Sequence, residues 1–204
     1  MSNSVAATVR PEVSQRAGRL WIVAAALLWS SSGVFAKSGV FDDWPLESRG
    51  AMLGFWRALF AGALLLPFVR QPRWTPRLVP MTLSFAGMNV TFLTAMTLTT
   101  AANAIWLQST APLWVFAIGL IWRTEPFDRR NLVPLVTAAG GVGLILYHEI
   151  AGDAQLGVAS GLASGVFFAG VVLSLRGLRH ENSAWLVALN HLVAAAVLAP
   201  YVIR

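Results

Sequence analysis

Hydrophobic positions along this chain form long, almost uninterrupted runs that are separated by short polar segments. A bilayer core about 30 Å thick needs about 20 mostly apolar residues for one helical span. Runs of about this length cover residues 20–40, 50–69, 78–98, 101–122, 131–148, 156–175 and 184–203, of which 131–148 is the shortest. Backbone amides inside a bilayer must be satisfied within the segment, and the alternating ten-residue strands of a membrane barrel are absent from the sequence. The pattern therefore predicts an all-α, polytopic membrane protein, a helical bundle of about seven transmembrane helices.

The polar segments between these runs predict the topology, because cytoplasmic loops of membrane proteins are rich in Lys and Arg. Eleven arginines fall in alternate segments: Arg10, Arg16, Arg19, Arg70, Arg73, Arg77, Arg123, Arg129, Arg130, Arg176 and Arg179. The opposite segments hold Lys37, Arg49 and Arg204 together with five acids. We therefore expect a multi-pass protein of the plasma membrane, the inner membrane of a bacterium, with a cytoplasmic N-terminus. Residues 1–19 are polar and predict a disordered cytoplasmic lead, or else part of a cleaved signal or transit peptide.

Two motifs recur at similar spacing. Ser32-Gly33-Val34-Phe35 in the first run returns as Ser164-Gly165-Val166-Phe167 in the sixth, and the Pro-containing end of the second run, 66–70, resembles 199–204. A unit of five helices crosses the membrane an odd number of times, so its copy begins from the opposite side. Many transporters consist of such inverted repeats, with the substrate site where the repeats meet.

This repetition predicts the domain organisation. One complete five-helix repeat is expected over residues 20–148, and the first two helices of an inverted second repeat over 156–204. About three further spans would be needed to complete the second copy.

Composition agrees with a membrane protein. Hydrophobic residues make up 56% of the 204 residues and charged ones only 12%, against about 25% in soluble domains. The net charge of +6 is then loop charge that sets topology, and we expect no nucleic-acid partner. The chain has no Cys, which excludes disulfides and thiolate metal sites, and we expect no metal and no cofactor.

Several further motifs carry a family resemblance. They are Leu28-Trp29-Ser30-Ser31-Ser32-Gly33 followed by Lys37, Phe55-Trp56-Arg57-Ala58, Thr99–Ala104 leading to Ala111-Pro112-Leu113-Trp114, Glu125, Gly140–Gly143 and Gly161–Arg176. Their order and spacing resemble the EamA-type carriers of the drug/metabolite transporter superfamily. The resemblance implies two inverted five-helix repeats, ten spans in all, that export small metabolites from the cytoplasm. Because this chain stops after the seventh predicted span, the resemblance implies a truncated member, and a homo- or heterodimeric partner would complete the fold.

Arg57 is the candidate with the clearest chemistry, because it is the only charged residue well inside a predicted span. It lies about 10 Å below the outer end of its helix at 1.5 Å per residue. A charge near the bilayer centre costs on the order of 2.5–3.5 kcal/mol, and no acid inside the membrane neutralises this one. Two interpretations stay open: Arg57 binds an anionic group of a solute, or it is a structural clamp that snorkels or binds loose backbone carbonyls.

Absence of a mid-span carboxylate argues against an exporter that binds cationic drugs and exchanges them for protons. The predicted solute is neutral, zwitterionic or anionic, with amino acids and related metabolites as the leading class. The expected partners are accordingly the lipid bilayer and a small-molecule solute.

Other candidate cavity residues are polar or aromatic side chains at helical spacing. The fourth run carries Asn103, Trp106, Ser109, Thr110 and Trp114 on one face, and Pro112 should bend that helix. In the third run the candidates are Thr82, Phe85, Asn89 and Met96, and in the first Trp29 and Ser32. Asn190 stands 133 residues after Arg57, at the matching position of the second repeat, beside His191. The alternative for all of these residues is interhelical hydrogen bonding or packing, which is common in membranes.

Glycines are assigned to packing. Gly157, Gly161 and Gly165 are spaced by four residues, and Gly140, Gly141 and Gly143 crowd the fifth run. Small residues at such spacing let helix backbones approach closely. Glu125, after the fourth run, is expected to pair with a loop arginine.

Other function classes fit less well. An intramembrane enzyme would need H-E-x-x-H, G-x-S-x-G or a buried Asp pair, none of which is present, and a retinal protein would need a Lys in the last helix. The sequence predicts no enzyme but a membrane transporter, an exporter of small metabolites that works by alternating access between inverted repeats. The alternative is an inactive or assembly-dependent half-carrier fragment that needs a partner subunit.

Overall fold

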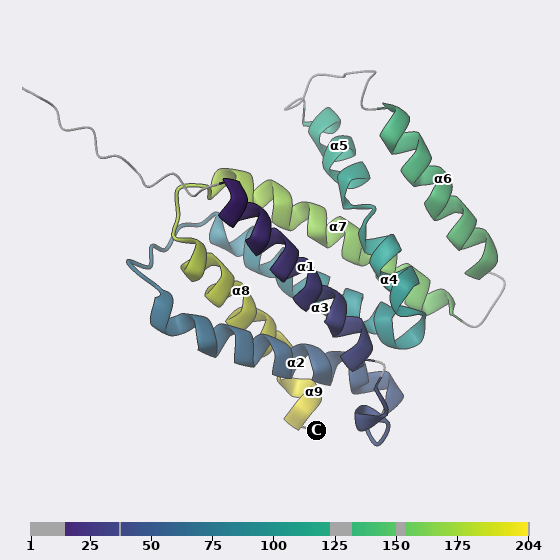
Figure 1. Cartoon of the computed structure of the whole chain (residues 1–204), viewed down its shortest axis with the longest axis horizontal. Coiled ribbons are helices and arrows are strands. Elements are labelled where there is room, and N and C mark those ends of the chain that lie inside the picture. Colours follow the sequence, from purple (N-terminus) through teal and green to yellow (C-terminus); the bar gives the residue numbers. More distant parts are fainter. Residues whose placement is uncertain (1–14, 37, 123–131, 150–153, 204) are drawn as a thin grey trace, which may run out of the picture. The chain divides into compact units, whose positions relative to one another are not determined.

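All regular structure in the described part of the chain is helical. The computed structural model describes residues 15–36, 38–122, 132–149 and 154–203 (Figure 1). The helices are α1 (Gln15–Ala36), α2 (Leu46–Leu65), α3 (Leu78–Leu98), α4 (Ala101–Gln108), α5 (Ala111–Ile121), α6 (Leu132–Glu149), α7 (Gln155–Gly177), α8 (Ser183–Leu198) and α9 (Pro200–Ile203), with 3-10 turns at Gly39–Phe41 and Leu66–Phe68. The prediction of an all-α polytopic membrane protein is confirmed.

Six stretches of these helices are long and apolar enough to cross a membrane. They are Ala17–Phe35, Ser48–Phe68, Leu78–Leu98, Ala101–Ile121, Gln155–Gly177 and Ser183–Ile203. The fifth predicted span, 131–148, corresponds to α6, where the apolar stretch among the described residues is Leu135–Leu144. The count of seven spans therefore stays a prediction, as does the division into repeats.

The first of two units comprises residues 1–35 and consists of α1 where it is described. Residues 15–19, which the sequence places in a disordered lead, are helical and extend the first predicted span toward the N-terminus. The rest of the chain, 36–204, forms the second unit. Several residues of the sequence-based topology lie outside the described part: Arg10, Lys37, Arg123, Glu125, Arg129, Arg130, Asp153 and Arg204.

Helix α3 lies at the centre of the second unit. It packs most extensively against α7 and also contacts α2, α4 and α8. Three buried clusters along its length tie it to its neighbours: one joins Phe92 and Met96 to Ala104 of α4, and another joins Met81 to Trp185 of α8. Met96, a predicted cavity candidate, is thus a core residue with 1% exposure.

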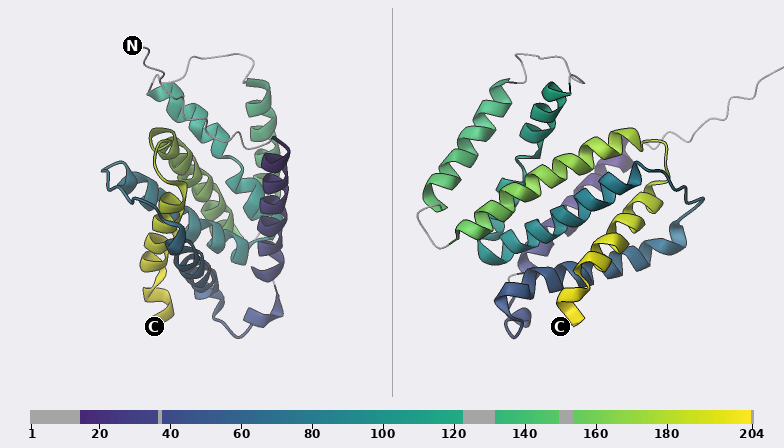
Figure 2. Two further views of the ribbon diagram at one scale, coloured as in Figure 1. Left: turned by 60° about the vertical axis from the view of Figure 1, so that its left-hand side comes forward. Right: turned by 180° about the vertical axis from the view of Figure 1, so that it is seen from behind.

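Small residues let α2 cross α8 closely. Ala58 is completely buried in a cluster with Ala194 and Ala195. A side chain at Gly62 would meet Leu192, so the two backbones approach here. Helices α2 and α8 cross at an angle in the right-hand view of Figure 2.

The predicted bend at Pro112 is a complete interruption of the span. Helix α4 ends at Gln108, Ser109 and Thr110 form a turn, and α5 begins at Ala111 with Pro112 in its first turn. Proline lacks the N–H that would continue the ladder, and the Thr110 hydroxyl donates to Leu107 O at 2.7 Å. The prediction that Pro112 bends the fourth helix is confirmed.

The three predicted packing glycines of α7 lie against the interrupted span and the end of α3. A side chain at Gly157 would meet Leu98 and Thr99, and one at Gly161 would meet Leu107. At Gly165 it would lie 3.1 Å from Leu107 O and 3.3 Å from Gln108 O, besides colliding with the Thr110 hydroxyl. Their assignment to packing is confirmed.

The glycines of α6 behave differently. Added side chains at Gly140, Gly141 and Gly143 would meet nothing within 4 Å among the described residues. The prediction that these glycines pack against another helix is wrong for the described structure, because small size permits a close approach but does not supply a neighbour.

The different surroundings of the α6 and α7 glycines predict that a Gly→Ala substitution changes the stability of the protein differently in the two helices. Gly165→Ala should destabilise the protein by about 1–3 kcal/mol, since the surrounding carbonyls belong to backbone and cannot swing away. Gly140→Ala should be neutral or stabilising by up to about 1 kcal/mol, because alanine restricts the unfolded chain. Thermal unfolding of the purified variants in one detergent measures both, and equal midpoints would contradict the packing assigned to α7.

Candidate functional site

The sequence-predicted site residues fall into two groups in the described structure. Arg57 and Asn89 meet between α2 and α3, while Asn103, Trp106 and Ser109 line one cavity beside α4. Asn190 is buried in α8. Trp29 and Ser32 belong to α1, and their side chains lie outside the described part of the structure.

Arg57 is held by an amide side chain. Its Nη2 donates a hydrogen bond to Asn89 Oδ1, and Asn89 Nδ2 in turn donates to Phe85 O at 2.9 Å. Asn89 is 1% exposed, whereas Arg57 is partly buried. Because both ends of its amide are engaged, Asn89 fixes where the guanidinium lies. The sequence-based alternative was that Arg57 binds loose backbone carbonyls. In the structure its hydrogen-bond acceptor is instead the side-chain amide of Asn89.

No carboxylate neutralises Arg57 within the described residues. The ion pair found there joins Arg49 to Asp42 at 3.2 Å, near the start of α2. The same residues contain no group of three or more His, Cys, Asp or Glu side chains that could hold a metal ion. The environment of Arg57 thus combines a positive charge with neutral polar and aromatic groups.

His191 adds an aromatic and polar side to this environment. Its ring lies 4.8 Å from that of Phe85, and its Nδ1 is 2.9 Å from Val187 O in its own helix. Arg57, Asn89, Phe85 and His191 form one cluster, which we call the arginine cluster. The sequence signal for His191 was only its position beside Asn190.

Asn190 is 5% exposed, and its Oδ1 has no hydrogen-bond partner among the described residues. It lies one helical turn from Leu186 and one from Ala194, which belong to the clusters joining α8 to α3 and α2. A buried amide oxygen without a partner costs about 1–3 kcal/mol, so Asn190 is poorly explained by packing alone.

The second group lines a cavity of about 470 Å³, here called the α4 cavity. Asn103, Trp106, Ser109 and Thr110 all face it from the interrupted span, so the structure brings this predicted polar stripe together. Helix α6 closes the other side with Thr137, Ala138, Gly141 and Val142. Trp114, the last residue of the stripe, instead donates from Nε1 to the Thr110 hydroxyl at 3.1 Å.

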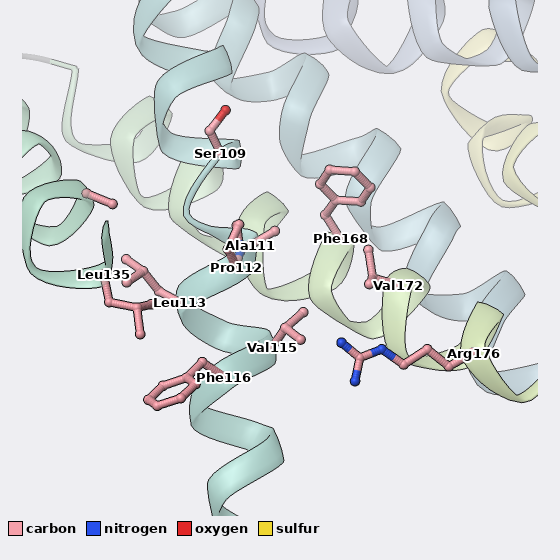
Figure 3. Close-up of a pocket in the computed structure, with 11 residues that line it drawn as sticks. Ser109, Ala111, Pro112, Leu113, Val115, Phe116, Leu135, Phe168, Val172 and Arg176 are labelled. Carbon is pink, nitrogen blue, oxygen red and sulfur yellow. The ribbon is translucent and has the colours of Figure 1, made fainter. Parts of the chain in front are cut away.

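A larger cavity of about 690 Å³, the α5 cavity, continues beyond Ser109 and Ala138, which line both. Its walls are mostly apolar and come from α5, α6 and α7. Arg176 of α7 turns its guanidinium toward this space in Figure 3. The sequence did not predict the contributions of α6 and Arg176, although the crowded glycines of α6 marked a helix with little side-chain bulk.

The chain matches one family model. The model of the EamA-like transporter family covers residues 16–147, more than half of the 204 residues. The chain belongs to the EamA-like transporter family. The matched range extends from α1 to α6. No curated protein and no solved structure matches the chain.

Membership makes this protein a membrane transporter that spans the bilayer several times, in agreement with the six long apolar helices found in the described part of the chain. The resemblance found in the sequence is confirmed at the level of the family. An EamA-like transporter has the bilayer as its surroundings and a small-molecule solute as its ligand.

The absence of cysteine allows a direct test of the α4 cavity. Ser109→Cys should react with a water-soluble thiol reagent, because residue 109 lines both cavities and is exposed. Ser164→Cys is the matched control, since Ser164 is fully buried and donates to Gly161 O at 2.6 Å. Mass spectrometry of the labelled protein gives the modified fraction. No labelling at 109 would show that the cavity is not open to water, and equal labelling of the two variants would contradict the burial of Ser164.

Proposed function

We propose that this protein exports small metabolites with a carboxylate or another anionic group, such as amino acids and related zwitterionic or anionic solutes. Arg57 carries the proposal. It is a cation inside a predicted span, positioned by Asn89, with no carboxylate partner in the described structure. Ionisable residues inside membranes are costly and commonly belong to a solute or ion pathway.

Hydrogen-bond capacity supports this role for Arg57. A guanidinium has five N–H donors in a planar fork, and Asn89 takes a hydrogen bond from one of its nitrogens. The remaining donors suit a carboxylate, which arginine binds with two parallel hydrogen bonds. Asn89 cannot neutralise the charge because its amide is uncharged, so the electrostatic attraction for an anion is retained.

The two groups of candidates lie at a similar level of the bundle. On α3, Asn89 is two residues from Gly87, which adjoins the Phe167 ring of α7, and Phe167 is two residues from Gly165. Gly165 in turn adjoins Thr110 at the interruption between α4 and α5. This succession of contacts supports a recognition site at one depth, with the arginine cluster on one side of the α3–α7 pair and the α4 cavity on the other.

The interrupted span supports a solute path. Transporter sites are often built at discontinuous helices, where freed backbone groups and short polar side chains meet the substrate. The α4 cavity, at about 470 Å³, falls within the usual range of small-molecule pockets, about 300–1,000 Å³. Alternating access between two inverted repeats would expose such a site to each side of the membrane in turn.

Loop packing supports the proposed orientation. Arg77 Nη1 donates to Gly177 O at 3.5 Å, so the α2–α3 and α7–α8 connections lie at the same end of the second unit. Both connections are rich in arginine, and we assign this end to the cytoplasm, with a bacterial inner membrane as the location. Completion of the second repeat by a homo- or heterodimeric partner stays a prediction.

Transport by reconstituted vesicles tests the role of Arg57. Arg57→Gln should lower uptake of carboxylate-bearing solutes by about ten- to hundredfold, the value of a lost charged hydrogen bond of about 1.5–3 kcal/mol. Uptake of a panel of anionic, zwitterionic, neutral and cationic solutes is measured, with protein orientation in the vesicles determined separately.

Asn89→Asp separates recognition from structure. Aspartate has nearly the same shape as asparagine. Its carboxylate cannot donate to Phe85 O as Asn89 Nδ2 does, but it would pair with the Arg57 guanidinium, and we expect this ion pair to offset the lost hydrogen bond while anionic solutes lose their binding partner. The variant should keep its thermal midpoint and lose uptake of the solutes that Arg57→Gln affects. If both variants take up solutes at the wild-type rate, Arg57 does not recognise the solute and is a structural clamp.

A further inference from the structure

A third cavity lies at the arginine-rich end of the second unit, away from the proposed solute site. It has a volume of about 420 Å³ and opens between the α2–α3 and α7–α8 connections. Its lining is polar and consists of Arg70, Gln71, Arg73, His180, Glu181 and Asn182.

Packing beneath the cavity holds its walls in place. The Trp185 indole donates from Nε1 to Arg73 O at 3.0 Å, and its ring meets that of Trp74 at 5.0 Å between centroids. Trp185 is 7% exposed in a cluster with Leu78 and Leu178. Gln71 has a φ of 52°, which a non-glycine residue rarely adopts. The connection is therefore shaped by protein contacts before any ligand arrives.

Charges of both signs face this cavity without pairing. Arg70 and Arg73 contribute two guanidinium groups and Glu181 a carboxylate, and none of them forms an ion pair among the described residues. His180 is engaged by Arg179, whose Nε donates to His180 Nε2 at 3.1 Å. The Asn182 side-chain oxygen accepts from Trp185 N at 2.9 Å and caps α8. Separated charges of this kind match a ligand that carries both a negative and a positive group.

The side chains around the cavity indicate that it lies at the level of the lipid headgroups. Trp74 is 74% exposed beside the arginines, and tryptophan is enriched where lipid headgroups lie. Leu66 and Phe68, just before Arg70, are exposed apolar residues at the end of the span Ser48–Phe68. A ligand in this cavity would thus have polar partners on one side and hydrocarbon on the other.

We propose that this cavity binds the phosphoethanolamine headgroup of a membrane phospholipid. Arg70 and Arg73 bind the phosphate, and Glu181 accepts hydrogen bonds from the primary ammonium. A phosphatidylglycerol headgroup supplies the phosphate but no cation for Glu181. Phosphatidylcholine supplies a cation that has no N–H to donate. Ethanolamine lipid alone among these three satisfies both parts of the wall.

Native mass spectrometry of the whole chain in detergent tests this assignment. Phosphatidylethanolamine, phosphatidylglycerol and phosphatidylcholine with identical acyl chains are offered at equal concentration, and the expected order places phosphatidylethanolamine first. Arg73→Gln should weaken binding of both the ethanolamine and the glycerol lipid by about fivefold, the effect of one basic residue near a headgroup. Glu181→Gln should weaken only the ethanolamine lipid. Arg179→Gln removes the same charge from the neighbouring α7–α8 connection, at a residue that does not line the cavity, and should bind like wild type.

Three outcomes would overturn the proposal. One is equal binding of the choline and ethanolamine lipids, and another is an unchanged ratio of ethanolamine to glycerol lipid in Glu181→Gln. The third is displacement of phosphatidylethanolamine by an equal concentration of inorganic phosphate, which would identify a site for free phosphate. All three readouts measure binding and do not depend on transport.

Discussion

Close contact between α7 and the interrupted α4–α5 span is the constraint on which the described bundle depends. Gly157, Gly161 and Gly165 leave one face of α7 without side chains, and the end of α3, Leu107 and the turn at Thr110 occupy that face. In a membrane no hydrophobic force draws helices together, so van der Waals contact at short range and buried hydrogen bonds must do so. The glycine face permits the van der Waals contact, because it brings the α7 backbone against Leu107, Gln108 and Thr110 at the end of α4.

The same contact positions the proposed site. The Thr110 hydroxyl donates to Leu107 O and accepts from Trp114, while the Ser109 hydroxyl donates to Ile105 O at 2.8 Å and Ser109 lines both cavities. Across the α3–α7 pair, α3 presents Asn89 to Arg57. The polar groups of the candidate site thus flank a closely packed centre, which holds the backbones of the helices that carry them.

Local sequence patterns predicted the positions of most helices. Contacts between residues far apart in the sequence were not predicted. Helix positions follow from runs of apolar residues, and the interruption follows from Pro112, because both effects act within a few residues. The Arg57–Asn89 bond joins residues 32 positions apart, and no local pattern distinguishes an amide partner from a carbonyl or a solute. Gly140, Gly141 and Gly143 are an example of a local pattern that misleads. Helix α6 is rich in glycine like α7, but whether another helix packs against those glycines depends on tertiary packing, which the local sequence does not encode.

The sparse packing of α6 has a consequence for motion. Its contacts with α4, α5 and α7 are few compared with those that join α3 to α7, and a side chain added at its glycines would meet nothing within 4 Å among the described residues. Dispersion contacts are individually weak and add up over an interface, so the free energy needed to separate two helices rises with the contact they share. Displacing α6 would therefore cost less than parting α7 from α3. The seam between α6 and the interrupted span is therefore where widening this bundle costs least, and the glycine-packed contact of α7 is where it costs more.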